Sequence, residues 1–465
     1  MNISEENMRK LEALNNDKVM EVVEMAVDLC KPEKVTVITD DKEDINYVRQ
    51  LALDNGEEKP LAMEGHTYHF DGPNDQARDK EHTKYLLKEE EDLGLDINSI
   101  EREKGIEEVL SYLDGSMKGK EMLVRFFSLG PNKSIFSIPA MQITDSSYVA
   151  HSEDILYRVG YEDFKLLEGS EDFLYFLHSA GHLENGVSAD IDKRRIYIDL
   201  YEDRVFSVNN QYAGNSVGLK KLAFRLAIKK ASKEGWLAEH MFISGVHGPD
   251  NRVTYFTGAF PSACGKTSTA MIPGNTVVGD DIAYLKLIDG EVRAVNVENG
   301  IFGIIRDVNP DDDPTIYKTL TTPRELIVSN VLVKDGKPYW MGMGQEIPEE
   351  GINYSGKWYK GKTDENGKEL TPSHKNARYT IRIKDLDNCD EKFDAKNGVT
   401  VNGIVYGGRD SDTTVPVAQT LDWSHGVFIG ACLESETTAA TLGQEGVRKH
   451  NPMANLDFLA IPIGD

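Results

Sequence analysis

One short stretch, AFPSACGKTSTAM at residues 259–271, constrains the fold more than any other part of this sequence. The alternating run RVTYFTGAF before it is typical of a β-strand, and KTSTAM begins with residues that suit a helix. Gly265-Lys266-Thr267-Ser268 is the tetrapeptide that phosphate-binding loops carry, although Phe260 stands where the usual pattern has its first glycine. The order strand, loop, helix predicts a P-loop in an α/β fold. The alternative is an ordinary helix start that contains a glycine.

A loop of this kind would bind phosphate through its main chain. The backbone amides of residues 262–267 could wrap a polyphosphate, and the start of the following helix adds positive potential. Lys266 would reach the terminal phosphates, and Thr267 would bind a magnesium ion.

Two adjacent carboxylates follow the loop. In TVVGDDIAYLKL, Asp280 and Asp281 come directly after an apolar strand and Gly279. A β-turn is the plain alternative for Gly-Asp. Because a metal ion bound to phosphate needs oxygen ligands just downstream of a P-loop, the pair indicates a metal site.

The charge balance excludes several classes of function. The chain has 52 basic and 78 acidic residues, a formal charge of -26, which disfavours nucleic acid and anionic membranes as partners. An anionic substrate would need basic residues gathered at its site. We find no export signal and no apolar run that could span a bilayer, and the four cysteines are widely spaced. We therefore expect a cytoplasmic protein.

The length of 465 residues predicts two or three domains. Residues 18–30 have helical spacing and residues 34–40 alternate like a strand. Residues 82–113 are rich in charge and helix formers, which predicts surface helices. A mixed sheet is expected from Met122 onward. Asn215-Ser216 can cap a lysine-rich helix that runs to about residue 233 and ends at Gly235.

Several blocks together resemble the GTP-dependent phosphoenolpyruvate carboxykinases. They are DQARDKEHTK, FSIPAMQITDSSYVAHS, EGWLAEHM, FPSACGKT, VGDDIAYLK, ENGIFG, HKNARY, GGR and DWSHGVFIGACLESETTAA. They occur in the family's order and cover nearly the whole chain. The resemblance implies a two-domain mixed α/β fold with an N-terminal domain at residues 1–235, a P-loop domain at residues 236–465, and an active-site cleft between them.

The resemblance also implies a reaction. Family members convert oxaloacetate and GTP to phosphoenolpyruvate, GDP and CO2 in gluconeogenesis, with two divalent metal ions. Decarboxylation leaves an enolate, which then takes the γ-phosphoryl group. Since water would protonate the enolate, the site must supply positive charge and exclude solvent. The segment LESETTAATLGQEGVRKHNP matches the family's mobile lid.

The family's Mn2+ site uses a lysine, a histidine and an aspartate. The histidine and the aspartate match His240 and Asp281, and a lysine can coordinate only when it is neutral. The lysine is Lys221 when counted forward from Tyr212 and Lys220 when counted back from His240. We favour Lys221 as the ligand, with Lys220 facing the substrate as a catalytic residue.

The remaining site residues are carried over from the same blocks. The resemblance places Mg2+ and the phosphates of GTP beside Ser262, Ala263, Cys264, Gly265, Lys266, Thr267, Ser268, Asp280, Arg378 and Arg409. It places the substrate beside Arg78, Tyr212, Ala213, Gly214, Asn376 and Arg378, with Arg78, Tyr212 and Cys264 among the catalytic groups. Guanidinium groups suit carboxylates and phosphates because of their planar fork.

The sequence departs from the family pattern at two positions. Ala213 stands where the family commonly has glycine, and Asp410 stands where it has a second arginine. The chain also stops at NPMANLDFLAIPIGD, whereas family members continue, so the guanine-binding segment is expected to be missing. A P-loop kinase for another small acid and an inactive carboxykinase fragment therefore stay open as alternatives. We expect a monomer.

Overall fold

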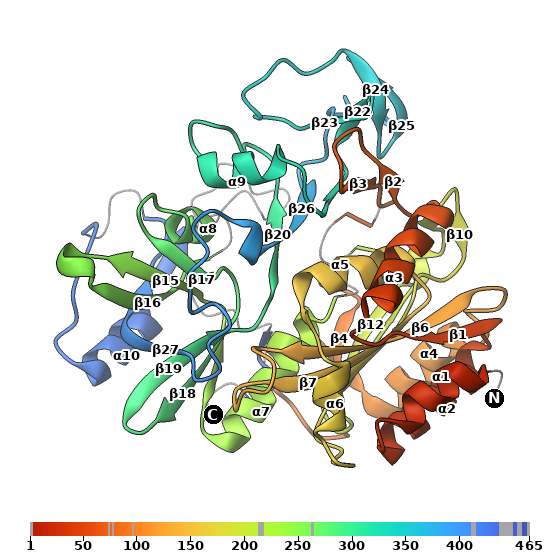
Figure 1. The fold of residues 1–465 in the computed structure, drawn as a ribbon, viewed down its shortest axis with the longest axis horizontal. Helices are drawn as coiled ribbons and strands as arrows, with labels where there is room; N and C mark the ends of the chain where they lie inside the picture. Colours follow the sequence, from red (N-terminus) through yellow and green to blue (C-terminus); the bar gives the residue numbers. More distant parts are fainter. Residues whose placement is uncertain are drawn as a thin grey trace.

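The structure is a computed structural model that describes residues 3–72, 75–76, 79–94, 97–212, 218–261, 265–410, 415–436, 450–452 and 458–462. Its sheets are flanked by helices, and helices and strands are interspersed along the chain (Figure 1). The fold is therefore mixed α/β, as the sequence predicts. No helix in these ranges has both the length and the apolar composition needed to cross a bilayer.

The first half of the chain forms a nine-stranded sheet with the order β1-β6-β7-β9-β13-β12-β4-β5, and β8 pairs with β6. The sheet contains both parallel and antiparallel pairs, so the expected mixed sheet is confirmed. Its strands are β1 (Lys34–Val37), β4 (Thr83–Leu87), β5 (Ser99–Glu101), β6 (Glu121–Leu129), β7 (Ile138–Thr144), β8 (Arg158–Val159), β9 (Leu174–Ser179), β12 (Arg195–Asp199) and β13 (Arg204–Val208).

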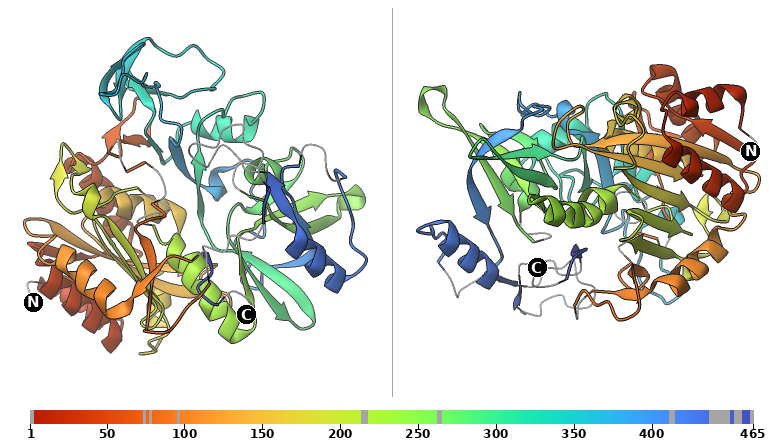
Figure 2. Two further views of the ribbon diagram at one scale, coloured as in Figure 1. Left: turned by 180° about the vertical axis from the view of Figure 1, so that it is seen from behind. Right: turned by 90° about the horizontal axis from the view of Figure 1, so that it is seen from below.

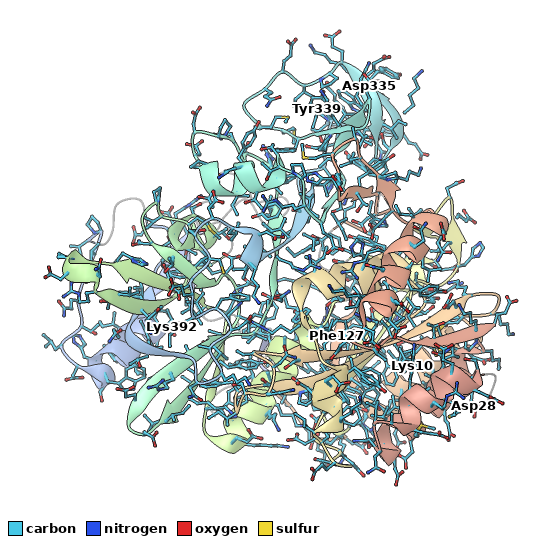
Figure 3. The ribbon with its side chains drawn as sticks, viewed as in Figure 1. Lys10, Asp28, Phe127, Asp335, Tyr339 and Lys392 are labelled. Carbon is cyan, nitrogen blue, oxygen red and sulfur yellow. The ribbon has the colours of Figure 1, made fainter. Side chains whose placement is uncertain are left out.

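Helices cover this sheet because each buries one apolar face. Phe127 lies fully buried among the packed side chains of the sheet, while Asp28 of α2 points outward (Figure 3). The helices are α1 (Glu5–Glu12), α2 (Asp17–Cys30), α3 (Lys42–Asp54), α4 (Arg102–Leu113), α5 (Ser147–Leu156) and α6 (Tyr161–Lys165). The prediction of a helix followed by a strand at residues 18–40 is thus confirmed by α2 and β1.

A seven-stranded sheet carries the predicted phosphate loop, with the order β14-β18-β19-β27-β16-β15-β17. Strand β16 leads to the loop, and α8 (Lys266–Ala270) follows it, which confirms the strand, loop, helix order. The strands are β14 (Leu237–Glu239), β15 (Phe242–His247), β16 (Val253–Ala259), β17 (Thr276–Gly279), β18 (Ala283–Ile288), β19 (Glu291–Asn296) and β27 (Val399–Tyr406). On the outer side of this sheet lies α10 (Trp423–Cys432), followed by β28 (Glu434–Glu436), which pairs with β29 (His450–Pro452).

A five-stranded sheet joins the two halves of the chain. Its order is β2-β3-β21-β26-β20, with β2 (Lys59–Pro60), β3 (His66–His69), β20 (Gly300–Ile304), β21 (Leu326–Ser329) and β26 (Arg378–Arg382). The β2–β3 hairpin comes from the first half, yet β3 pairs in parallel with β21 of the second half. A four-stranded sheet and α9 (Pro314–Leu320) lie beside it (Figure 1), with β22 (Leu332–Lys334), β23 (Lys337–Tyr339), β24 (Glu350–Asn353) and β25 (Gly356–Tyr359).

One helical segment connects the halves. A π-helix at Lys221–Leu226 continues into α7 (Ala227–Glu234), which ends where Gly235 adopts a left-handed φ of 74°. Leu222 and Phe224 pack in one core with Tyr284 from β18. The predicted stop at Gly235 is therefore confirmed, whereas the predicted cap at Asn215-Ser216 lies outside the described residues. The views in Figure 2 show the helix between the two large sheets.

One prediction from the sequence is wrong. Residues 82–113 were expected to form surface helices, but residues 83–87 form β4, which is paired with β12 and largely buried. Thr83, Tyr85 and the apolar Leu86 suit a strand, and pairing with β12 outweighs the surrounding charge. Among the described residues of this stretch, only those of α4 are helical.

Candidate active site

Three side chains from separate parts of the chain converge on Asp281, which lies just after β17. His240 Nε2 lies 2.7 Å from Asp281 Oδ1, and the ammonium of Lys266 contacts the same oxygen. Lys220 contacts the other oxygen, Oδ2. Residues that are far apart in sequence thus share one carboxylate. Burial acts to raise the pKa of Asp281, but Lys220 and Lys266 outweigh it and hold this pKa well below its ordinary value.

His240 is held between a cation and an anion. Its Nε2 atom lies 2.7 Å from Lys266 Nζ as well as from Asp281 Oδ1. Burial, and then the Lys266 ammonium, lower the pKa of His240, so the imidazole is favoured in its neutral form. A neutral imidazole beside a carboxylate and an amine is a donor set that suits a divalent transition-metal ion such as Mn2+.

A second carboxyl group extends this donor set. Asp280 is buried, its Oδ1 atom has no hydrogen-bond partner among the described residues, and Thr267 Oγ1 donates to Oδ2 at 3.3 Å. Burial raises the pKa of Asp280 despite Lys266. Among the described residues, no three His, Cys, Asp or Glu side chains gather as a metal cluster, and the set found here includes a lysine. The lysine, histidine and aspartate donors therefore fit a cation. The Asp280 carboxyl group and Thr267 would also help to hold it.

The phosphate loop enters the same place. Gly265 has a φ of 90°, in the left-handed region that favours glycine, and α8 starts at the next residue. Lys266 points back to the cluster, while Ser268 is exposed. The other loop residues of the prediction, Ser262, Ala263 and Cys264, lie outside the described residues.

The two adjacent lysines have different surroundings. Lys220 Nζ contacts Asp281 and lies 3.5 Å from Glu298 Oε1. Lys221 begins the π-helix, and only 5% of it is exposed. The geometry favours Lys220 as the amine beside the carboxylate, whereas the sequence favours Lys221. Because a π-helix turns differently from an α-helix, counting residues along it does not settle which lysine faces inward.

The residues predicted for the substrate form a neighbouring group. Arg378 Nε donates to Tyr212 Oη at 3.1 Å, and both side chains lie against the ring of Phe302. Asn376 donates to the backbone oxygen of Gln76 at 3.2 Å. This group thus consists of residues from both halves of the chain. Arg78, Ala213 and Gly214 lie outside the described residues.

Arg409 is exposed in the segment that follows β27. Its backbone N–H donates to Ser435 Oγ at 3.0 Å, and its carbonyl accepts from Glu436 at 2.8 Å. Gly407 N–H donates to Ala259 O at 3.0 Å, which ties this segment to β16, the strand before the phosphate loop.

Two buried glutamates of the site were missed in the sequence. Glu298 accepts from Tyr157 Oη at 3.2 Å, and burial raises its pKa to about 7 against the effect of Lys220. Glu153 accepts from the backbone N–H of Leu219 at 3.1 Å, and burial raises its pKa to about 8. Glu298 stands in the block ENGIFG, which is the signal that could have identified it. No local pattern singles out Glu153.

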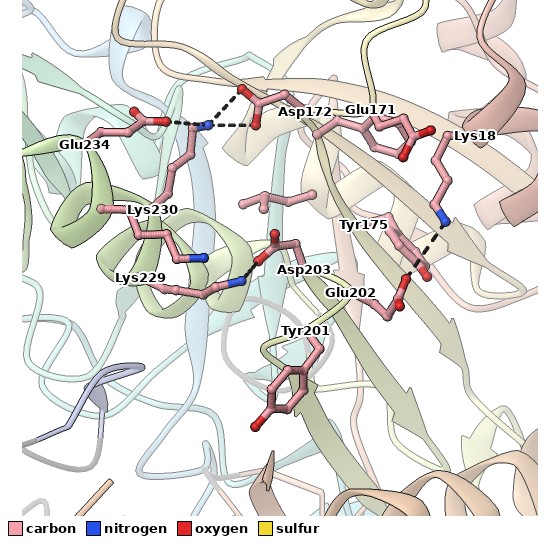
Figure 4. A pocket seen from close by; sticks show the side chains of 13 residues that line it. Lys18, Glu171, Asp172, Tyr175, Tyr201, Glu202, Asp203, Lys229, Lys230 and Glu234 are labelled. Carbon is pink, nitrogen blue, oxygen red and sulfur yellow. Dashed lines mark hydrogen bonds and ion pairs between the residues drawn. The ribbon is translucent and has the colours of Figure 1, made fainter. Parts of the chain in front are cut away.

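A polar pocket of about 330 Å³ lies elsewhere, between α7 and the loops at residues 171–175 and 201–203 (Figure 4). Two of its lysines are paired with acids: Lys229 contacts Asp203, and Lys230 lies 2.7 Å from Asp172. No predicted site residue lines it. The Asp281 cluster is therefore the stronger candidate for chemistry.

The fold and the cluster define a class: P-loop proteins that act on nucleotide phosphates beside a strand-end aspartate. Comparison with known proteins narrows this class. The family model described as phosphoenolpyruvate carboxykinase N-terminal domain matches residues 21–232, and the one described as the C-terminal P-loop domain matches residues 236–465.

Individual relatives agree with the family models. The phosphoenolpyruvate carboxykinase (GTP) of Pyrococcus abyssi is 56% identical over 100% of this chain and 75% of its own length. The enzyme of the same name from Sulfurisphaera tokodaii is 48% identical over 100% of this chain and 74% of its own, and that of Anaeromyxobacter dehalogenans is 34% identical over 97% and 76%. The chain belongs to the GTP-dependent phosphoenolpyruvate carboxykinase family. Enzymes of this family depend on a metal ion and act on a nucleotide and on oxaloacetate or phosphoenolpyruvate.

Proposed function

We propose that this chain converts oxaloacetate and GTP to phosphoenolpyruvate, GDP and CO2. The observation that carries the proposal is the convergence of Lys220, His240 and Lys266 on Asp281 in a chain of this family. A P-loop kinase for another small acid would also need the phosphate loop. That alternative does not explain why an imidazole and a second lysine contact the same carboxylate.

The reaction consists of two changes in bonding. The bond between C3 and the C4 carboxylate of oxaloacetate breaks, CO2 leaves, and the electron pair remains as an enolate. The enolate oxygen then forms a bond to the γ-phosphorus of GTP, and the bond from that phosphorus to the β-phosphate oxygen breaks to give GDP. Both steps build up negative charge, which nearby positive groups stabilise.

Residues of this chain have distinct parts in these steps. Arg378, held by Tyr212, would bind a carboxylate or phosphate through its planar fork. Lys266 would draw charge from the transferred phosphoryl group. Burial of Tyr212 beside Phe302 supports a site wall that keeps water from the enolate.

We propose Mn2+ as the ion at Lys220, His240 and Asp281, and Mg2+ with GTP at Thr267 and Asp280. A bound divalent ion would supply Lewis acidity to the oxygens that gain charge. The neutral state favoured for His240 supports this assignment. Lys220 replaces Lys221 as the proposed amine ligand, and it would have to lose its proton to coordinate.

The wider predictions are proposals as well. We propose that the domain boundary lies between residues 235 and 236, which is supported by the end of α7 at Gly235. The free thiols of Cys30, Cys389 and Cys432 suit a cytoplasmic, reducing setting. A monomer is proposed on the charge of -26, which disfavours self-association.

The test is a product assay on the purified 465-residue chain with Mn2+, oxaloacetate and either GTP or ATP. We expect phosphoenolpyruvate and CO2 in equal amounts, with GTP preferred. Lys266→Met should abolish most of this activity, while Lys368→Met, at an exposed site, should not. Phosphoryl transfer without CO2 would favour the kinase, and a folded chain without either product would favour the inactive alternative.

A further inference from the structure

Helix α5 carries two adjacent acids into the interior of the molecule. Every residue from Ser147 to Leu156 is buried, and the helix packs against β6 and β7 of the nine-stranded sheet and against β20 and β26 of the five-stranded sheet (Figure 1). Asp154 has cationic partners, since Arg49 lies 2.7 Å away and Arg125 contacts it as well. The bond that Glu153 makes is of a different kind. Because a buried carboxyl group is costly, its place calls for a reason.

Glu153 reaches the start of the helical segment that carries the two lysines. Its Oε2 atom accepts from the backbone N–H of Leu219 at 3.1 Å, and the carbonyl of Leu219 accepts from Ala223 N–H at 2.8 Å. The N–H groups at a helix start have no partner inside the helix, so an acceptor from elsewhere fixes that start. Since Lys220 is the next residue, the bond from Glu153 holds the backbone directly before it.

The end of α5 also holds the carboxyl group that lies beside Lys220. Tyr157, the residue after α5, donates from Oη to Glu298 Oε1 at 3.2 Å, and Lys220 Nζ lies 3.5 Å from the same oxygen. The backbone next to Glu298 is bound to the helix too, since Asn299 N–H donates to Leu156 O at 2.7 Å. The backbone and the side chain of Lys220 are therefore both positioned from one end of α5.

The contact between α5 and β20 leaves no room for a side chain. A Cβ atom at Gly300, the first residue of β20, would lie 2.6 Å from Ile155 O and 2.5 Å from Ile381 O. Both atoms belong to the backbone, so neither can move aside easily. Helix α5 is thus a firm base from which Glu153 can act.

We propose that Glu153 is a positioning residue: by holding the start of the π-helix, it sets the place of the Lys220 amine beside Asp281. This inference rests on the proposed function, in which that amine and the Asp281 carboxylate bind Mn2+. The effect passes through the backbone of Leu219, and the hydrogen bond needs an acceptor oxygen but no charge. Burial raises the pKa of Glu153 to about 8, which favours the neutral carboxyl group at pH 7.

Two variants separate the acceptor oxygen from the charge and the volume. Glu153→Gln keeps an oxygen that can accept from Leu219 N–H, and Glu153→Met fills a similar volume without a strong acceptor. Glu101→Ala is the matched control, because Glu101 accepts from the backbone N–H groups of Glu103 and Lys104 at the start of α4, at 2.8 and 3.0 Å. Helix α4 packs in a core cluster that does not include Leu219.

The first measurement needs neither metal nor substrate. Each folded protein is treated with formaldehyde and cyanoborohydride at pH 7, and mass spectrometry of its fragments gives the rate at which the Lys220 amine is methylated. In Glu153→Met this rate should rise about 3–10-fold, because loss of the hydrogen bond at the helix start loosens the contact between Lys220 and Asp281. In Glu153→Gln and in Glu101→Ala the rate should stay within about twofold of the parent.

The second measurement is a titration with Mn2+ in the absence of substrate, read by the electron paramagnetic resonance of free Mn2+. Half saturation should need about 3–10-fold more Mn2+ in Glu153→Met than in the parent chain. The melting temperature should fall in both Glu153→Met and Glu101→Ala. A glutamate with a merely structural role would lower the melting temperature without changing the methylation of Lys220 or the binding of Mn2+.

The proposal is overturned if Glu153→Met folds and leaves the methylation rate of Lys220 unchanged. It is also overturned if Glu153→Gln raises that rate about 3–10-fold, since the charge and not the acceptor oxygen would then hold the lysine. The comparison with Glu153→Gln decides the matter even if Glu153→Met does not fold. A parent chain that makes no phosphoenolpyruvate would reject the proposed function, and the methylation rates would still decide the role of Glu153.

Discussion

Two histidines, the half-buried His240 and the buried His151, show how differently the same residue types are arranged in the two charged regions of this molecule. His240 has a lysine on one side and an aspartate on the other, and its pKa is lowered by burial and by Lys266. His151 lies between Glu58 and Glu325, at 2.8 and 3.1 Å. Burial acts to lower the pKa of His151, but the two carboxylates outweigh it and raise this pKa.

The region around His151 joins the two halves of the chain. Arg49 binds Asp154 at 2.7 Å and Glu325 at 2.5 Å, and Arg382 contacts Glu325 too. Here positive and negative groups alternate, so each charge has an opposite neighbour. In the Asp281 cluster, two lysines and a histidine share one carboxylate, and Asp280 keeps a buried oxygen without a partner among the described residues. We therefore expect the paired charges around His151 to stabilise the fold, and the charges around Asp281 to bind a ligand.

The largest effect on activity is expected from a change at Asp281, the centre of the charged cluster. Asp281→Asn removes the carboxylate that three positive or neutral nitrogen groups share, so kcat/KM for phosphoenolpyruvate formation should fall by about 10²–10³-fold. The measurement is a steady-state assay with Mn2+. Asp311→Asn, an exposed aspartate, is the matched control. Undiminished activity of Asp281→Asn would show that this cluster is not the site.

The two lysines should differ in the same assay. Lys220→Met should lower activity by about 10–100-fold and raise the Mn2+ concentration needed for half activation, because its amine contacts Asp281. Lys221→Met should have the smaller effect on Mn2+. If Lys221→Met has the larger effect instead, the assignment from the sequence is right and the one from geometry is not.

A substitution among the paired charges around His151 should lower the stability of the protein and leave its activity nearly unchanged. Glu325→Gln weakens contacts to Arg49, His151 and Arg382, and Glu325 is partly exposed, so we expect a loss of about 1–3 kcal/mol in the free energy of unfolding. Activity of the folded protein should stay within about threefold. Urea unfolding and the product assay measure the two effects. Glu349→Gln, in an exposed pair, should change neither quantity.

The smallest expected effect is a pH dependence. Because the pKa of His151 is raised on folding, its contribution to stability is fully present below the unfolded-state pKa of about 6.5 and is lost as pH rises through the folded pKa. The stability advantage of the parent chain over His151→Gln should therefore shrink above that pH. Melting temperatures from pH 5.5 to 9 test this, with the exposed His182→Gln as control. An advantage that grows with pH would contradict the assigned direction.

Local sequence patterns were sufficient to predict those helices and strands that depend mainly on local features. The helix α2 and the strands on both sides of the phosphate loop follow from the spacing of their apolar residues. Strand β4 was predicted wrongly because its pairing with β12, more than a hundred residues away, outweighs the local charge.

The site was predictable only in part for the same reason. The family blocks identified His240, Lys266 and Asp281, and the structure brings them together. The choice between Lys220 and Lys221 could not be made from spacing, because the count from Tyr212 and the count from His240 give different lysines. The sequence could not identify Glu153 as a buried site residue, because glutamates are usually exposed. Its burial depends on the three-dimensional surroundings.

The β2–β3 hairpin has a consequence for synthesis on the ribosome. Asp71, just after β3, bonds to Asn330, which follows β21 and is 259 residues further along the chain. At ~5–20 residues per second, translation needs about 13–50 s to supply that partner. During this interval the hairpin has no sheet to join, so a nascent chain that pauses early would display it to chaperones and proteases.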